Sequence, residues 1–183
     1  MSVSLAAAVL ATTMRMVASH EYAEGAPPGF SGGFKEESCY ACHFHAEPNA
    51  PGGTLTIEGV PTNYVGGQKY TLIVTLSRTG MKRAGFQLVA RFKEGGAQAG
   101  TLAFGTGENE RVKVEGQGGL QYAGQKIAGA SVSGAAAKWT IDWTAPAGGG
   151  LVIFHVAANA ADGNESADGD FVYTTTAESL PPP

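Results

Sequence analysis

The chain has 183 residues, of which 43% are hydrophobic, enough for one domain with a core and a short extension. Twelve basic and sixteen acidic residues give a formal net charge of -4, and no Lys/Arg cluster offers a track for phosphates, so we expect no nucleic-acid partner. The 27 glycines are scattered and have no triplet period, which excludes a collagen-like chain and is typical of a β protein with many turns.

Residues 1–19 are predicted to be a signal peptide. Residues 3–16 are mostly apolar or small, and this run is too short to span a bilayer. Val17 and Ser19 supply the small residues that cleavage after Ser19 requires. No Lys or Arg precedes the run, which leaves a truncated start or an N-terminal core helix as alternatives. The predicted signal peptide indicates an exported protein, periplasmic or extracellular, and we expect no transmembrane anchor because no later stretch is long and apolar enough.

Residues 20–53 are predicted to form a loop-rich segment, because prolines and glycines interrupt regular structure throughout. Residues 54–176 are predicted to form an all-β domain, since apolar and polar residues alternate between Gly, Asn and Asp turns. The expected strands are 54–58, 69–78, 85–93, 101–104, 112–115, 137–144, 151–158 and 171–175. About eight strands of this kind predict an antiparallel immunoglobulin-like sandwich, followed by a tail at residues 177–183.

Alternation within three of these strands defines the expected core between two sheets. The apolar faces comprise Tyr70, Leu72, Val74 and Leu76; Phe86, Leu88, Ala90 and Phe92; and Trp139, Ile141 and Trp143.

The loop-rich segment contains the run Cys39, Tyr40, Ala41, Cys42, His43, which has the spacing of covalent c-type haem attachment. Two thiols at this spacing reach the two vinyl groups of one porphyrin, and the adjacent imidazole supplies an axial nitrogen to iron. These are the only two cysteines in the chain. The sequence therefore predicts one haem c, bound through Cys39, Cys42 and His43.

Two other uses of the cysteine pair stay open. An oxidising compartment favours a simple disulfide between Cys39 and Cys42. The pair could also join His45 and a distant histidine such as His155 in a zinc site, although structural zinc motifs usually place their His pair further along the chain from the cysteines.

The second axial ligand of the iron decides much of the function, because Met raises the reduction potential, a second His lowers it, and an open position admits small ligands. Met81 is the favoured candidate, since it lies in a polar loop between two expected strands. A gap-filling contact under that loop is an equally good interpretation of Met81. His155 is the alternative ligand; it lies on the strand face opposite Phe154 and Val156, where a partly buried histidine is the more common outcome.

Oxygen-bearing side chains also crowd a Gly-containing turn between Asp162 and Asp170. Calcium prefers such ligands, but the spacing does not match an EF-hand loop. A hairpin turn with solvated Asp and Asn is the favoured interpretation.

Four runs resemble bacterial exported proteins of the choice-of-anchor type, which join a CxxCH segment to a sandwich similar to the reelin N-terminal (reeler) domain. Residues 25–28 and 30–33 precede the cysteines, and residues 84–88 and 157–161 follow them. The resemblance implies a reeler-type sandwich and haem binding at Cys39, Cys42 and His43, and it implies no substrate.

We therefore expect an electron-transfer protein in which the sandwich is a scaffold and the N-terminal segment presents the haem to redox partner proteins. Catalysis has little support, because the chain has no Ser/His/Asp order, phosphate loop or HExxH motif. Two alternatives are an extracellular binding or adhesion module with structural or absent haem, and a haem sensor or peroxidase with an open iron site.

Overall fold

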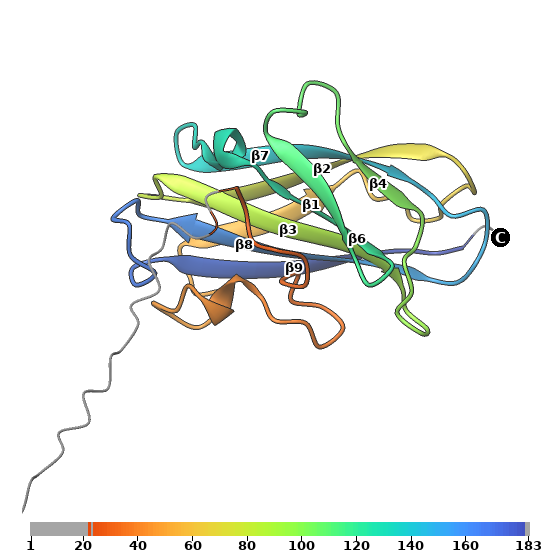
Figure 1. Ribbon diagram of the computed structural model, residues 1–183, viewed down its shortest axis with the longest axis horizontal. Coiled ribbons are helices and arrows are strands. Elements are labelled where there is room, and N and C mark those ends of the chain that lie inside the picture. Colours follow the sequence, from red (N-terminus) through yellow and green to blue (C-terminus); the bar gives the residue numbers. More distant parts are fainter. Residues whose placement is uncertain (1–21, 23, 182–183) are drawn as a thin grey trace, which may run out of the picture.

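Residue 22 and residues 24–181 are described by a computed structural model, and their regular structure is mainly β-strand (Figure 1). The predicted signal peptide, residues 1–19, lies outside the described residues. The strands are β1 (Gly53–Glu58), β2 (Lys69–Arg78), β3 (Arg83–Phe92), β4 (Thr101–Phe104), β5 (Val112–Gln117), β6 (Leu120–Gln125), β7 (Ala136–Thr144), β8 (Val152–Ala161) and β9 (Phe171–Ser179). Two short 3-10 helices, η1 (Cys39–Ala41) and η2 (Ile127–Ala130), complete the regular elements, and neither could cross a membrane.

The strands form two sheets that pack face to face. One sheet has the order β1-β2-β7-β4 and the other the order β5-β6-β3-β8-β9. All of the paired strands run antiparallel. The predicted all-β antiparallel sandwich is therefore confirmed.

The core lies between the sheets and contains the apolar faces that alternation predicted. Trp139 and Trp143 of β7 are fully buried and meet aromatic residues of the opposite sheet. The ring of Trp139 stacks on Phe86 at 4.5 Å between centroids, and Trp143 packs edge-on against Phe154 at 4.8 Å. Each indole N–H donates to a backbone carbonyl, at 2.8 Å and 2.9 Å, so the two large side chains are buried without an unpaired donor.

Strand β6 was missed by the sequence analysis, and the last strand is longer than predicted. Residues 118 and 119 are both glycines with positive φ, and they join β5 to β6 in a tight hairpin. A Gly-Gly pair is the signal that could have revealed this hairpin. At the other end β9 continues to Ser179, and Leu180 bridges to Asn63, so residues 177–180 belong to the sandwich and not to the predicted tail.

Residues 24–52, which we call the N-terminal lobe, form no strand and run across the outer face of the five-stranded sheet (Figure 1). This face carries Gln87, which is only 3% exposed. Its amide oxygen accepts the backbone N–H of Phe30, and its amide nitrogen donates to the carbonyl of Pro27 at 2.8 Å. The central strands β3 and β8 of the five-stranded sheet are thus covered on both faces, by the other sheet and by the lobe.

A largely buried carboxylate fastens the middle of the lobe to the same face. Glu36 accepts hydrogen bonds from Ser31 of the lobe, from Arg91 of β3 at 2.8 Å and from Tyr122 of β6. The side chains of Glu36 and Arg91 are 14% and 15% exposed. Burial, together with the Glu36 carboxylate, raises the pKa of Tyr122, so its hydroxyl stays a donor.

Replacing the fully buried Ile141 with Ala is expected to lower the free energy of unfolding by about 2–5 kcal/mol, because it leaves a cavity between the sheets. Urea unfolding followed by tryptophan fluorescence measures the change. Ile127→Ala is the matched control; this side chain is 50% exposed, and we expect a change within about 0.5 kcal/mol. Equal losses in both variants would contradict this assignment of the core.

Replacing Glu36 with Gln is expected to loosen the lobe, because one buried acceptor and the charge opposite Arg91 are lost. We expect a loss of about 1–3 kcal/mol, with faster amide hydrogen exchange in residues 24–52 than in the strands. The exposed Glu37→Gln substitution is the control and should leave exchange unchanged. Uniform acceleration over the whole chain would show that Glu36 does not act on the lobe in particular.

Candidate functional site

The two cysteines of the CxxCH run lie on one short turn. Ser38 caps η1 by accepting the N–H of Tyr40 at 3.2 Å, and the N–H of Cys42 and of His43 both donate to the carbonyl of Cys39, at 3.2 Å and 3.0 Å. Side chains three residues apart on a 3-10 turn lie one above the other, so Cys39 and Cys42 project from the same side. Both are free thiols, and η1 packs against β8.

His43 is held by a buried carboxylate from the other end of the chain. Its Nδ1 lies 2.6 Å from Oδ2 of Asp170, whose side chain is 2% exposed, whereas the imidazole is 32% exposed. An ionised carboxylate can only accept, so Nδ1 carries the hydrogen and Nε2 points away from this contact. Asp170 is held in turn by the amide nitrogen of Asn159, at 3.2 Å, and by the backbone N–H of Asp162, at 3.1 Å.

A second His–Asp pair lies next to the first but at the surface. Nδ1 of His45 is 3.1 Å from Asp168, and these side chains are 47% and 76% exposed. The ring of His45 packs edge-on against Phe171 at 5.0 Å. Further along, Asn49 exchanges backbone and side-chain hydrogen bonds with β9, so the lobe continues over this edge strand towards β1.

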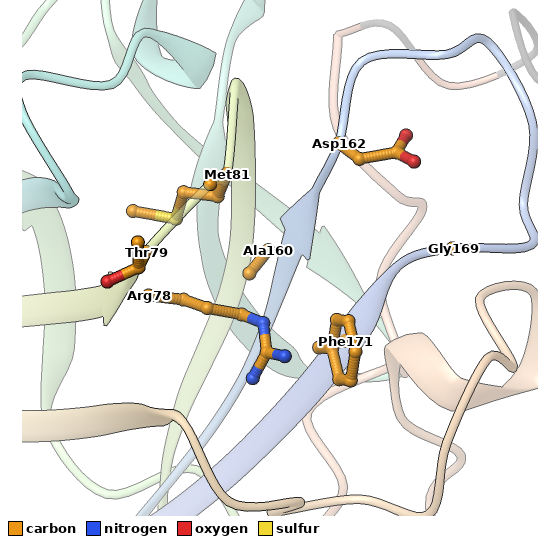
Figure 2. Close-up of a pocket in the computed structure, with 8 residues that line it drawn as sticks. Arg78, Thr79, Met81, Ala160, Asp162, Gly169 and Phe171 are labelled. Atoms are coloured by element: carbon orange, nitrogen blue, oxygen red, sulfur yellow. The ribbon is translucent and has the colours of Figure 1, made fainter.

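Met81 lies on the core side of the five-stranded sheet. It is 5% exposed and lines a pocket of about 160 Å³ at the end of the sandwich, with Ala160 and Phe171 (Figure 2). Ala160 and Asn159 are neighbours on β8 and therefore face opposite sides of the sheet. Since Asn159 contacts Asp170, the partner of His43, Met81 packs on the face of β8 opposite to this contact, and Asp162 and Gly169 of the following turn also line its pocket. The burial of Met81 agrees with the gap-filling interpretation.

His155 lies on the same outer face as Asn159 but four residues away, about 13 Å along β8. Phe34 packs edge-on against its ring at 5.2 Å, and Gly33 lies so close that a Cβ there would be 2.1 Å from the ring. Burial lowers the pKa of His155, so the imidazole is neutral near pH 7. The structure therefore brings His155 to the lobe, but to Gly33 and Phe34 and not to His43.

The remaining alternatives involve other metals. His45 and His155 contact different parts of the lobe, so the predicted zinc set is not assembled, and within residues 24–181 no group of three or more His, Cys, Asp or Glu could hold a metal ion. The turn after β8 is built from side chains that accept backbone N–H groups, as the hairpin interpretation expects. The side chain of Asp162 accepts the N–H of Asn164 at 3.0 Å, that of Asn164 accepts the N–H of Ser166 at 2.7 Å, and that of Ser166 accepts the N–H of Asp168 at 3.2 Å.

Comparison with known proteins gives a fold and no family. No family model and no curated protein matches the chain. Among solved structures, the reelin-N domain of F-spondin has 21% identity and a TM-score of 0.49 over 79% of this chain and 96% of its own. A human F-spondin reeler domain has 20% identity and a TM-score of 0.47 over 74% of this chain and 96% of its own. A cohesin module from a Clostridium perfringens family 33 glycoside hydrolase has 11% identity and a TM-score of 0.50 over 70% of this chain and 96% of its own. At these identities the likeness concerns the two-sheet sandwich alone.

The two thiols are expected to react at different rates in the folded, haem-free protein. Cys39 is partly buried, and this burial raises the pKa of its thiol to about 12, whereas the Cys42 side chain is exposed. A thiol with so high a pKa is almost wholly protonated at about pH 8, and the thiolate is the nucleophile. Alkylation of Cys39 in Cys42→Ser should be at least about tenfold slower than alkylation of Cys42 in Cys39→Ser.

Mass spectrometry after timed treatment with iodoacetamide measures both rates. In concentrated urea the two variants should react alike, because unfolding removes the burial that protects Cys39. Equal rates in the folded state would mean that the partial burial of Cys39 does not protect its thiol.

Proposed function

We propose that this protein carries one haem c, held by Cys39, Cys42 and His43, and that it is an exported electron carrier. The observation that carries the proposal is the contact between His43 and the buried Asp170. Metal-binding histidines almost always donate their second ring N–H to a carboxylate, a carbonyl or water, which fixes the other nitrogen as the ligand. His43 has this arrangement, with Nδ1 used and Nε2 left for iron.

The donor set also fits the group. Cys39 and Cys42 are free, project from one side of η1 and immediately precede His43, as two thioether bonds and one axial bond to a single haem require. When bound, the haem supplies a one-electron couple. The protein's part is to hold it on a lobe that is fastened to a rigid sheet by Glu36 and Gln87.

The CxxCH motif lies at the protein surface, a position that suits electron exchange between a bound haem and redox partner proteins. Cys42 is exposed, and the next side chain after the motif, Phe44, is 58% exposed. Weak, small interfaces are typical of redox encounters, and the formal charge of -4 favours a basic partner. Export is part of the same proposal and rests on the predicted signal peptide at residues 1–19.

A second candidate is an extracellular binding or adhesion module with structural or absent haem. It draws support from the sandwich itself, which cohesin modules share, and from a lobe that is packed through its own hydrogen bonds. The third candidate, a sensor or peroxidase with an open iron position, draws support from the placement of Met81 and His155 away from His43.

Expression in a host that matures c-type cytochromes tests the proposal. The wild-type protein should retain haem on a denaturing gel and give a pyridine haemochrome spectrum of the c type. Cys39→Ala/Cys42→Ala should be folded and colourless, since both thioether bonds are lost. A colourless, folded wild-type protein would favour the binding module.

If haem is attached, its spin state separates the remaining candidates. A six-coordinate, low-spin spectrum that Met81→Ala or His155→Ala converts to high spin would identify the second ligand and support electron transfer. A high-spin spectrum in the wild-type protein would support a sensor or peroxidase.

A further inference from the structure

We propose that Asp170 is the positioning residue for His43: it holds the imidazole with Nε2 available to iron and lowers the reduction potential of the site. The inference rests on the haem attachment proposed above. It concerns a residue that the sequence analysis grouped with turn-forming oxygens, 127 positions away from His43.

The contact has the features of a strong, charge-assisted hydrogen bond. The separation of 2.6 Å is at the short end for an imidazole and a carboxylate. Because the Asp170 side chain is 2% exposed, water screens the interaction little. The contact therefore acts on His43 more strongly than a surface pair would.

The surroundings hold Asp170 in place from two sides. Its Oδ1 accepts the N–H of Asp162 in the turn after β8, and its Oδ2 accepts the side-chain amide of Asn159 on β8. The other end of that amide, Oδ1 of Asn159, is buried and has no hydrogen-bond partner. If the Asn159 amide were rotated by half a turn, its oxygen would face the negatively charged carboxylate of Asp170 and repel it. The observed orientation, with the NH₂ group towards Asp170 and the oxygen unpaired, is therefore the one that an ionised Asp170 favours.

When the N–H at Nδ1 donates a hydrogen bond to a carboxylate, the other ring nitrogen, Nε2, becomes a better electron donor to a metal. A stronger donor stabilises ferric over ferrous iron, because the ferric ion carries the higher charge, and this lowers the reduction potential. Loss of such a partner typically costs ten- to a hundredfold in metal affinity. A tenfold change in the preference for ferric iron corresponds to about 59 mV for a one-electron couple.

The chain provides its own control in the exposed pair of His45 and Asp168. Asp170→Asn keeps an oxygen acceptor near His43 but removes the charge, and Asp168→Asn makes the same chemical change at a surface pair with no proposed iron ligand. Redox titration should give Asp170→Asn a potential at least about 59 mV above the wild type, a tenfold change. Asp168→Asn should match the wild type. Equal potentials in all three proteins would overturn the proposal.

A measurement on the haem-free wild-type protein does not depend on any variant folding. Long-range proton–nitrogen NMR spectra of ¹⁵N-histidine-labelled protein should show His43 with hydrogen on Nδ1, and with Nε2 bare at a pH where the ring is neutral. Hydrogen on Nε2 instead would overturn the proposal. If the wild-type protein fails to take up haem, the proposed function and the effect on potential both fall, while this spectrum still decides whether Asp170 positions His43.

Discussion

The polar outer face of the five-stranded sheet is the constraint on which the rest of the molecule depends. Gln87 and Arg91 on β3 and Asn159 on β8 project from this face and need hydrogen-bond partners once they are buried. The N-terminal lobe supplies partners for Gln87 and Arg91 through backbone groups at Pro27 and Phe30 and through the carboxylate of Glu36, whereas Asn159 donates to Asp170 in the turn after β8. A lobe without strands of its own is thereby held in one position, because its contacts are directional.

That position decides what surrounds the CxxCH motif. The lobe carries η1 over β8 and then passes around β9, so His43 reaches the turn between these two strands, where Asp170 is anchored. Asp162 and Gly169 of this turn also line the pocket that contains Met81, on the core side of β8. The candidate site is therefore a surface site with one strongly held histidine, and the sandwich contributes the carboxylate that holds it.

Strong periodicity made most of the sandwich predictable. The ends of β2 and β4 agree with the sequence, because both strands lie between recognisable turns. β6 was missed because two small residues, Ala123 and Gly124, interrupt its alternation, and the end of β9 was missed because its last residues are polar. Such stretches become strands through pairing with a neighbour, which a single sequence does not display.

The sequence alone determined the CxxCH motif, since two cysteines and a histidine within five residues are a local pattern that any fold must keep together. It also determined the two-sheet core, because side-chain alternation follows from the pleat of a strand. Only the tertiary structure decided that His43 meets Asp170, that Glu36 fastens the lobe, and that Met81 is buried on the core side of the sheet. These contacts join residues far apart in the chain, and their distances depend on strand register and on the path of the lobe, neither of which leaves a periodic signal in the sequence.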